Sequence, residues 1–342
     1  MSALALVTAP NDSGRRPRAL PWRRMLLVTW LQHRGALLGA AALFGAVALY
    51  LGIMGLIIHH AWDVSVAAAT TCHPASSVAC QELANSFADN WHSGATIAFP
   101  LQLLPALIGA FVGAPVLARE LETGTFRYSW TQGFGRTRWI VAKMALIGGL
   151  LAVLAAAFGV LANWYFGPFV EAGQLIPLDP RIFDLEGVAF PGWVLAAFAI
   201  GAFAGMLIRR VVPAMATAMA VVGGLGLAAG LYLRQRYLPP LVMPGANGPG
   251  PSDWTLGSWY TGRGGQSVSP FTVEQLCPGP GPLGSSSGAG PQCLPQHGIT
   301  QWWSYQPPSR YWPFQGIEGG ALLALAVLLI AVTIWLVHRK AA

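Results

Sequence analysis

The sequence has few charged residues. Only 10% of its 342 residues are Asp, Glu, Lys or Arg, whereas 54% are hydrophobic and the mean hydropathy is +0.51. Soluble globular domains carry about 25% charged residues, so this composition favours an integral membrane protein. The net charge of +7 and the pI of about 9.6 would suggest nucleic-acid binding in a soluble protein. Here the basic residues are distributed between long apolar runs, and we expect no nucleic-acid partner.

Sequence motifs of nucleotide binding and metal-dependent catalysis are also missing. Lysine occurs only twice, as Lys143 and Lys340, and neither lies in a GxxxxGK[ST] phosphate-binding loop. The sequence contains no HExxH and no CxxC motif, and its seven histidines are scattered. We therefore predict that the chain is not an enzyme, has no catalytic residue and binds no cofactor of its own. If ATP drives this protein, a separate subunit must bind it.

Six apolar runs are long enough to cross a membrane, which requires roughly 20 mostly apolar residues. They cover about 36–58, 96–117, 140–166, 190–208, 211–233 and 317–337. We predict an all-α integral membrane protein with a single six-span domain over 36–337. A cytoplasmic tail and interfacial helix precede it over 1–35, and a cytoplasmic C-terminus follows over 338–342. Three prolines in the second run predict a kinked or broken span.

The distribution of charge predicts the orientation of the spans. If the N-terminus is cytoplasmic, 15 of the 20 Lys and Arg residues lie on the inner side. On the same assignment, 10 of the 13 Asp and Glu residues lie outside or at the outer edge. Since cytoplasmic loops are enriched in Lys and Arg, we predict a multi-pass protein of the cell membrane with both termini in the cytoplasm.

The four cysteines fall in two local pairs, both in predicted outer loops. They are Cys72 with Cys80 and Cys277 with Cys293. This pattern predicts two disulfides in an oxidising compartment. Cys72, His73 and Cys80, with two histidines at 59 and 60, could instead bind a metal, but their spacing matches no common zinc pattern and we predict no metal site.

The segment 118–143 (ARELETGTFRYSWTQGFGRTRWIVAK) is a dense polar stretch between the second and third spans. Glu120 and Glu122 stand where a short helix from Glu120 to Ser129 would begin, and negative charge is favoured there by the helix dipole. Arg136, Arg138 and Lys143 then suit the membrane interface. An ordinary basic cytoplasmic loop remains the alternative.

The long outer loop over 234–315 contains stretches rich in Pro, Gly and Ser, which predict largely irregular structure. Aromatic residues before the last span suit the outer membrane interface. Glu318 begins that span, and is either an interfacial carboxylate or part of an outer gate.

The segment 118–143 resembles the permease subunits of ABC-2 type ATP-binding cassette transporters. These carry an acid-x-acid-x-Gly-Thr stretch, a turn, an arginine pair and a lysine between their second and third spans. The corresponding residues here are Glu120, Glu122, Gly124, Thr125, Gly133, Arg136, Arg138 and Lys143. The segment Tyr305 to Glu318 (YQPPSRYWPFQGIE) is similar to the end of the last outer loop in actinobacterial permeases of this kind.

The resemblance implies a permease that pairs with a second copy or a second permease and is driven by an ATP-binding cassette ATPase, which binds ATP and Mg²⁺. The cargo would be a hydrophobic or amphipathic molecule, moved outward. Coupling to the ATPase would rest on Glu120, Glu122, Gly124, Thr125 and Arg127, and headgroup anchoring on Arg136, Arg138 and Lys143. A membrane scaffold or sensor that uses the same loop to bind a cytoplasmic partner remains the main alternative. An ion-coupled transporter is disfavoured, because no predicted span has an ionisable residue near its centre.

Overall fold

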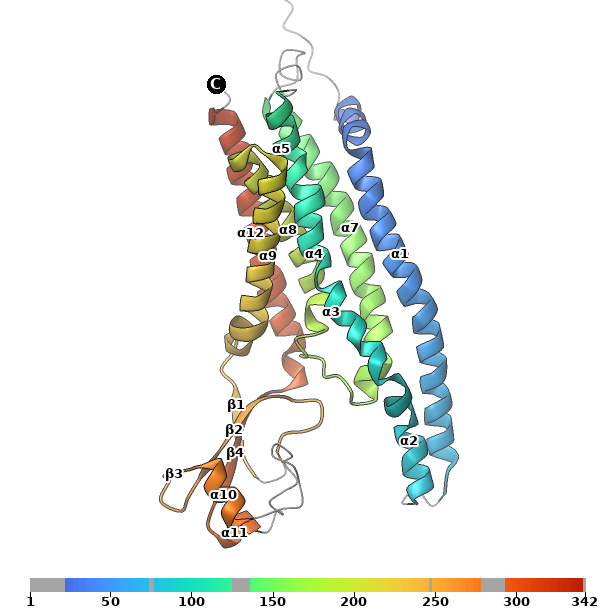
Figure 1. The fold of residues 1–342 in the computed structure, drawn as a ribbon, viewed down its shortest axis with the longest axis vertical. Helices are drawn as coiled ribbons and strands as arrows, with labels where there is room; N and C mark the ends of the chain where they lie inside the picture. Colours follow the sequence, from blue (N-terminus) through green and yellow to red (C-terminus); the bar gives the residue numbers. More distant parts are fainter. Residues whose placement is uncertain (1–21, 74–76, 125–135, 246–247, 278–292, 341–342) are drawn as a thin grey trace, which may run out of the picture.

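The computed structural model describes residues 22–73, 77–124, 136–245, 248–277 and 293–340. In this part of the chain, six helical segments are long and apolar enough to span a membrane: Leu26–Thr71, Asn85–Thr123, Thr137–Glu171, Ala189–Ile208, Val211–Arg236 and Pro308–Arg339. Each contains one of the predicted runs, which confirms the six-span helical architecture. Figure 1 shows the helices side by side with their long axes roughly parallel.

The two ends of the bundle differ. One end carries the end of α5 (Ala114–Thr123), the start of α7 (Arg136–Glu171) and the end of α12 (Tyr311–Lys340). We call it the basic end, because it also holds Arg209 and Arg210. A small β-sheet lies beyond the opposite end, which we call the sheet end (Figure 1).

Helix α1 (Trp22–Thr71) is continuous, so the predicted interfacial helix is the first part of the first span helix. At the sheet end, α1 extends past the predicted span, and α2 (Val78–Trp91) packs back against it. The predicted outer loop between spans one and two is therefore mostly helical. A disulfide between Cys72 and Cys80 closes the turn that joins α1 to α2.

The second span is broken into short helices, as its prolines predict. It comprises η1 (His92–Ile97), α3 (Ala98–Leu101), α4 (Leu104–Ile108), the π-helical η2 (Gly109–Gly113) and α5. Pro100 and Pro105 have no N–H group for a helical hydrogen bond. Beside the break, Gln102 Nε2 donates to the carbonyl oxygens of Pro180 (2.8 Å) and Arg181 (3.0 Å).

Helix α8 (Ala189–Ile208) and the second span are the most buried of the six segments, and α8 contacts α5, α7, α9 (Val211–Ala228) and α12. Its glycines allow the second span to approach closely. A Cβ atom at Gly201 would lie 2.1 Å from the carbonyl oxygen of Gly109, and one at Gly205 would lie 2.5 Å from that of Ala114. Helix α9 continues through η4 (Ala229–Leu233) and η5 (Arg234–Arg236).

The outer segment contains an antiparallel sheet with strand order β1-β4-β2-β3, which corrects the prediction of a largely irregular loop. The strands are β1 (Leu241–Pro244), β2 (Trp254–Thr261), β3 (Ser267–Val268) and β4 (Thr300–Gln306). Three residues in each of β2 and β4 are aromatic, a type with high β-propensity. Trp259 of β2 pairs with Trp302 of β4. The short elements α10 (Pro270–Leu276), α11 (Cys293–Gln296), η3 (Phe183–Leu185) and η6 (Pro308–Arg310) complete the described chain.

Candidate functional sites at the two ends of the bundle

At the basic end, Glu120 of α5 joins three helices. Its carboxylate pairs with the ammonium group of Lys143 on α7 and lies 3.9 Å from His33 Nε2 on α1. The Lys143 side chain is fully buried, and its nitrogen lies 4.2 Å from the centre of the Trp139 ring, a cation–π distance. This carboxylate therefore binds the end of the second span to the third span and lies beside the first.

Glu122, one turn further along the segment, reaches a fourth span. Its carboxylate accepts a hydrogen bond of 3.0 Å from the backbone N–H of Val211, the first residue of α9. A negative charge is favourable at this position, because the unpaired N–H groups make a helix N-terminus partly positive. Glu120 and Glu122 together connect α5 to α7 and α9.

The predicted short helix beginning at Glu120 is wrong. Helix α5 ends at Thr123, and Gly124 follows in the left-handed conformation (φ 71°), the usual C-terminal cap. The two acids thus lie at the C-terminal end of a span helix, where the helix dipole disfavours negative charge. Lys143 and the N-terminus of α9 compensate for that charge.

The remaining residues of the predicted coupling loop lie only partly within the described chain. Thr125 and Arg127 lie outside the described residues. Arg136 is the first residue of α7, and Arg138 is exposed on its first turn. Lys143 differs from its prediction as a headgroup anchor, since its side chain faces the bundle interior and pairs with Glu120.

At the sheet end, a buried arginine holds two carboxylates. Arg234 is fully buried, and its guanidinium donates to both oxygens of Glu318 on α12, at 2.9 and 3.0 Å. It also pairs with Asp184 and lies over the Phe183 ring, with 4.4 Å from Cζ to the ring centre. This ion cluster connects the end of α9 to α12 and to the loop between α7 and α8.

Glu318, the predicted gate residue, therefore lies inside the protein. Trp193 Nε1 of α8 donates to one of its oxygens at 2.9 Å, and the Tyr237 hydroxyl donates to the other at 3.0 Å. The sequence patterns did not predict Arg234, Asp184, Trp193 or Tyr237 as partners. One signal was available, because Arg234 follows span five and Glu318 begins span six, which places opposite charges at the same depth.

The loop before α8 carries two acids, Asp184 and Glu186, whose pKa values are raised by burial. Burial raises the pKa of Asp184, although the ion pair with Arg234 opposes this change. Burial likewise raises the pKa of Glu186 to about 7, against the hydrogen bond of 3.1 Å that the Tyr311 hydroxyl donates. Gln315 of α12 binds the end of the same loop, since its Oε1 accepts a hydrogen bond of 2.8 Å from the Ala189 N–H. These groups close the sheet end and include no nucleophile–base pair.

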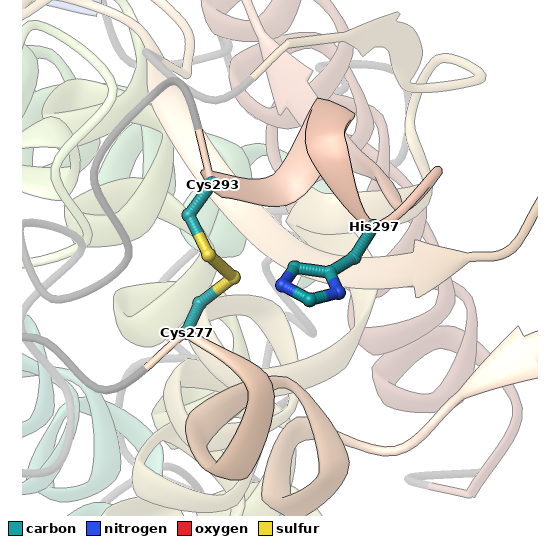
Figure 2. A group of neighbouring side chains, drawn as sticks. All are labelled: Cys277, Cys293 and His297. Atoms are coloured by element: carbon teal, nitrogen blue, oxygen red, sulfur yellow. A yellow bond between two sulfur atoms is a disulfide. The ribbon is translucent and has the colours of Figure 1, made fainter.

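Both predicted disulfides, Cys72–Cys80 and Cys277–Cys293, are confirmed. Figure 2 shows the His297 imidazole facing the second disulfide. Within the described ranges, Cys277, Cys293 and His297 form the one group of three potential metal ligands whose donor atoms lie within 4.8 Å of one another. The alternative metal site around Cys72 gains no support. The run 284–288 (GSSSG) fits the GxSxG letters of serine hydrolases, but it lies outside the described residues.

A half-open pocket of about 290 Å³, lined by both apolar and polar groups, lies between α1, the broken second span and α7. Its walls include Met54, Ile58, Ile97 and Pro100, and hydroxyl groups of Ser93, Thr96 and two tyrosines line it as well. One of them, Tyr165, donates a hydrogen bond of 3.1 Å to the Gly94 carbonyl oxygen.

A family model described as "ABC-2 membrane transporter related" matches residues 38–234, more than half of the chain. The match covers spans one to five and ends at Arg234, before the sheet. No curated protein and no solved structure matches the chain.

Proposed function

The chain belongs to the ABC-2 membrane transporter related family, and from this premise we propose that it is the membrane-spanning subunit of an ABC exporter. A separate ATPase subunit binds ATP and Mg²⁺ and docks at the basic end, which faces the cytoplasm together with both termini. Two permease subunits, identical or different, enclose the transport path. The cargo is a hydrophobic or amphipathic molecule.

One observation supports coupling through the segment 118–143. Its first acids, Glu120 and Glu122, bind groups on α7 and α9, and Glu120 also lies beside His33 of α1, so a force applied to this segment acts directly on α5, α7 and α9. Glu122 is exposed and shares one oxygen with α9, which leaves its other oxygen for the ATPase. Arg127 would supply a second ATPase contact. Closure of the ATPases would then bias the bundle between its inward-open and outward-open states.

The ion cluster at the sheet end acts as the outer gate of this transporter. Arg234, Glu318 and Asp184 hold α9 against α12 and the loop before α8, so these elements separate only if the buried ion pairs break or move together. Such a network favours a two-state transition over gradual opening. In the outward-open state, Glu318 would be rehydrated.

The half-open pocket between α1, the second span and α7 supports a cargo with both apolar and polar parts. Its aliphatic walls suit a hydrocarbon chain or ring, and its hydroxyl groups can hydrogen-bond one polar end. A volume of about 290 Å³ accommodates only part of a large molecule, so the rest would extend toward the bilayer or the partner permease.

The test is co-purification from native membranes in mild detergent. We expect a P-loop ATPase at about one copy per chain, and we expect Glu122→Arg to release it. The matched control is Glu82→Arg, which reverses an exposed acid on α2 at the opposite end and should leave the complex intact. If no ATPase appears, or if Glu122→Arg and Arg127→Glu both leave association and transport unchanged, the coupling assignment is wrong. A different partner bound to the loop would then favour the scaffold or sensor alternative.

A further inference from the structure

We propose that Cys277, Cys293 and His297 form a zinc site that exists only when the Cys277–Cys293 disulfide is reduced. The described structure contains the oxidised form, in which both sulfurs are bonded to each other. A metal ion is bound by thiolates, so the disulfide and the zinc complex exclude one another. The proposal concerns the outer sheet domain and is independent of ATPase coupling.

The backbone brings the three donor groups together in the folded domain. Cys293 and His297 are four residues apart on one turn, and the His297 N–H donates to the Cys293 carbonyl oxygen at 3.3 Å. Cys277 ends α10, and its N–H donates to the Val273 carbonyl oxygen at 2.8 Å. The imidazole faces both sulfurs in Figure 2. Reduction of the disulfide therefore leaves three ligands that are already close in space.

The distances fit tetrahedral zinc. All three donor atoms lie within 4.8 Å of one another. With Zn–S bonds of about 2.3 Å, a tetrahedral ion separates two thiolate sulfurs by roughly 3.8 Å, so the two sulfurs, which are bonded to each other in the oxidised form, must move apart after reduction. Two thiolates and one imidazole are ligands that zinc prefers, and a water molecule would complete the fourth position.

The surroundings place the site at the edge of a small apolar core. Cys277 is buried against Val273, Leu294 and Ile299, whereas His297 is exposed. The buried side holds one thiolate in a fixed place, and the exposed side lets an ion enter from solvent. The Cys72–Cys80 pair shows no comparable third donor among the described residues, although His73 is its sequence neighbour.

The chemistry requires an external dithiol as the reductant. One thiolate of the dithiol attacks a disulfide sulfur to give a mixed disulfide, and its second thiol displaces the protein cysteine. The protein gains two electrons and two protons, and the dithiol becomes a cyclic disulfide. Zinc binding then releases the two thiol protons to solvent. Since zinc binds only the dithiol form, it opposes reoxidation by mass action.

The experiment uses the full chain in detergent with the other pair removed (Cys72→Ser, Cys80→Ser). After reduction with a phosphine, Co²⁺ is titrated in as a spectroscopic substitute for Zn²⁺. We expect thiolate-to-cobalt absorbance that saturates at one ion per chain and disappears when Zn²⁺ is added. The same protein without reduction should show none. Because changes to groups around a metal already weaken binding by about 10–100-fold, His297→Ala should weaken Co²⁺ binding by at least tenfold.

Two further measurements make the result decisive. The reciprocal variant (Cys277→Ser, Cys293→Ser) retains the Cys72–Cys80 pair and should give no saturable absorbance after reduction. The His297→Ala variant keeps both structural cysteines, so it can be purified oxidised and checked for a monodisperse elution profile before reduction. The proposal is overturned if the reduced chain shows no thiolate–cobalt band. It is also overturned if His297→Ala binds as tightly as its parent, or if the reciprocal variant binds equally well.

Discussion

At each end of the bundle, one buried cation holds several spans together: Lys143 at the basic end and Arg234 at the sheet end. The two ends differ in how many hydrogen bonds the groups around the cation make. At the sheet end, both oxygens of Glu318 accept two hydrogen bonds each, from Arg234, Trp193 and Tyr237, and Arg234 Nη1 is buried without a hydrogen-bond partner among the described residues. At the basic end, both Glu120 Oε2 and His33 Nε2 are buried without a hydrogen-bond partner within the described part of the chain. Unpaired buried polar atoms cost free energy, and the cluster around Glu120 has two of them against one in the cluster around Arg234, so we expect the basic-end contacts to be the less stable.

This difference suggests a division of roles. The more fully hydrogen-bonded network at the sheet end resists rearrangement, because breaking one contact leaves a buried charge without its partner. A half-satisfied network has atoms available for new partners, and it lies beside the segment to which we assign ATPase docking. We therefore expect the basic end to rearrange first in a transport cycle and the sheet end to follow. The variants below test that order.

The largest effect is expected from Arg234→Met, which leaves the carboxylates of Glu318 and Asp184 without their cation. Removing one partner of a buried pair costs about 3–5 kcal/mol. The apparent unfolding midpoint in detergent should fall by many degrees, and transport should be lost. Arg236→Met is the matched control, since Arg236 is exposed on the same short helix. Equal midpoints for the two variants would contradict the role of the cluster.

The next effect is a pH dependence of the sheet end. The pKa of Glu186 is raised from 4.5 to about 7 in the folded protein, so the folded state binds more protons than the unfolded state between these values. The contribution of Glu186 to stability should therefore be complete below about pH 4.5. It should be lost as the pH rises to about 7, by roughly 1.4 kcal/mol per pH unit. Glu186→Gln should flatten this part of the stability–pH profile. Glu171→Gln should leave the profile unchanged, because Glu171 is exposed at the end of α7.

A smaller effect is expected for the Glu120–Lys143 pair at the basic end. Glu120→Gln, Lys143→Met and the double variant form a thermodynamic cycle. Residues in direct contact show coupling of about 0.5–3 kcal/mol, and we expect a value in this range. The readouts are the unfolding midpoint and the ATPase activity of the complex. If the two single effects simply add, Lys143 stabilises the bundle without holding Glu120.

The smallest effect is expected for Glu122. Glu122→Gln keeps a hydrogen-bond acceptor for the Val211 N–H but removes the charge at the N-terminus of α9, which should cost about 0.3–1 kcal/mol. The unfolding midpoint should change little, whereas ATPase association should weaken. A large loss of stability with normal association would reverse our assignment and make Glu122 a purely structural cap.

The spans were predictable from hydropathy alone, because a segment that crosses lipid must be apolar over about 20 residues and must pair its backbone polar groups internally, as a helix does. The sheet was not predicted, because stretches rich in Gly, Pro and Ser separate its strands and the aromatic residues of the outer segment were assigned to the membrane interface. Arg234 and Glu318 are 84 residues apart, so their contact depends on how α9 and α12 pack, which no local pattern reports. The position of Glu120 differs from its prediction for a local reason. The predicted helix runs through Gly124, whereas the left-handed conformation of this glycine ends a helix.

The length of α1 has a mechanical consequence. Its 50 residues form a rod of about 75 Å at 1.5 Å per residue, more than twice the roughly 30 Å of the bilayer's hydrocarbon core. Such a rod can act as a lever, and α2 and the Cys72–Cys80 disulfide brace its arm at the sheet end. A tilt of about 5° at the basic end would swing the tip by roughly 6 Å over that length. A small movement near His33 would therefore be amplified at the opposite surface.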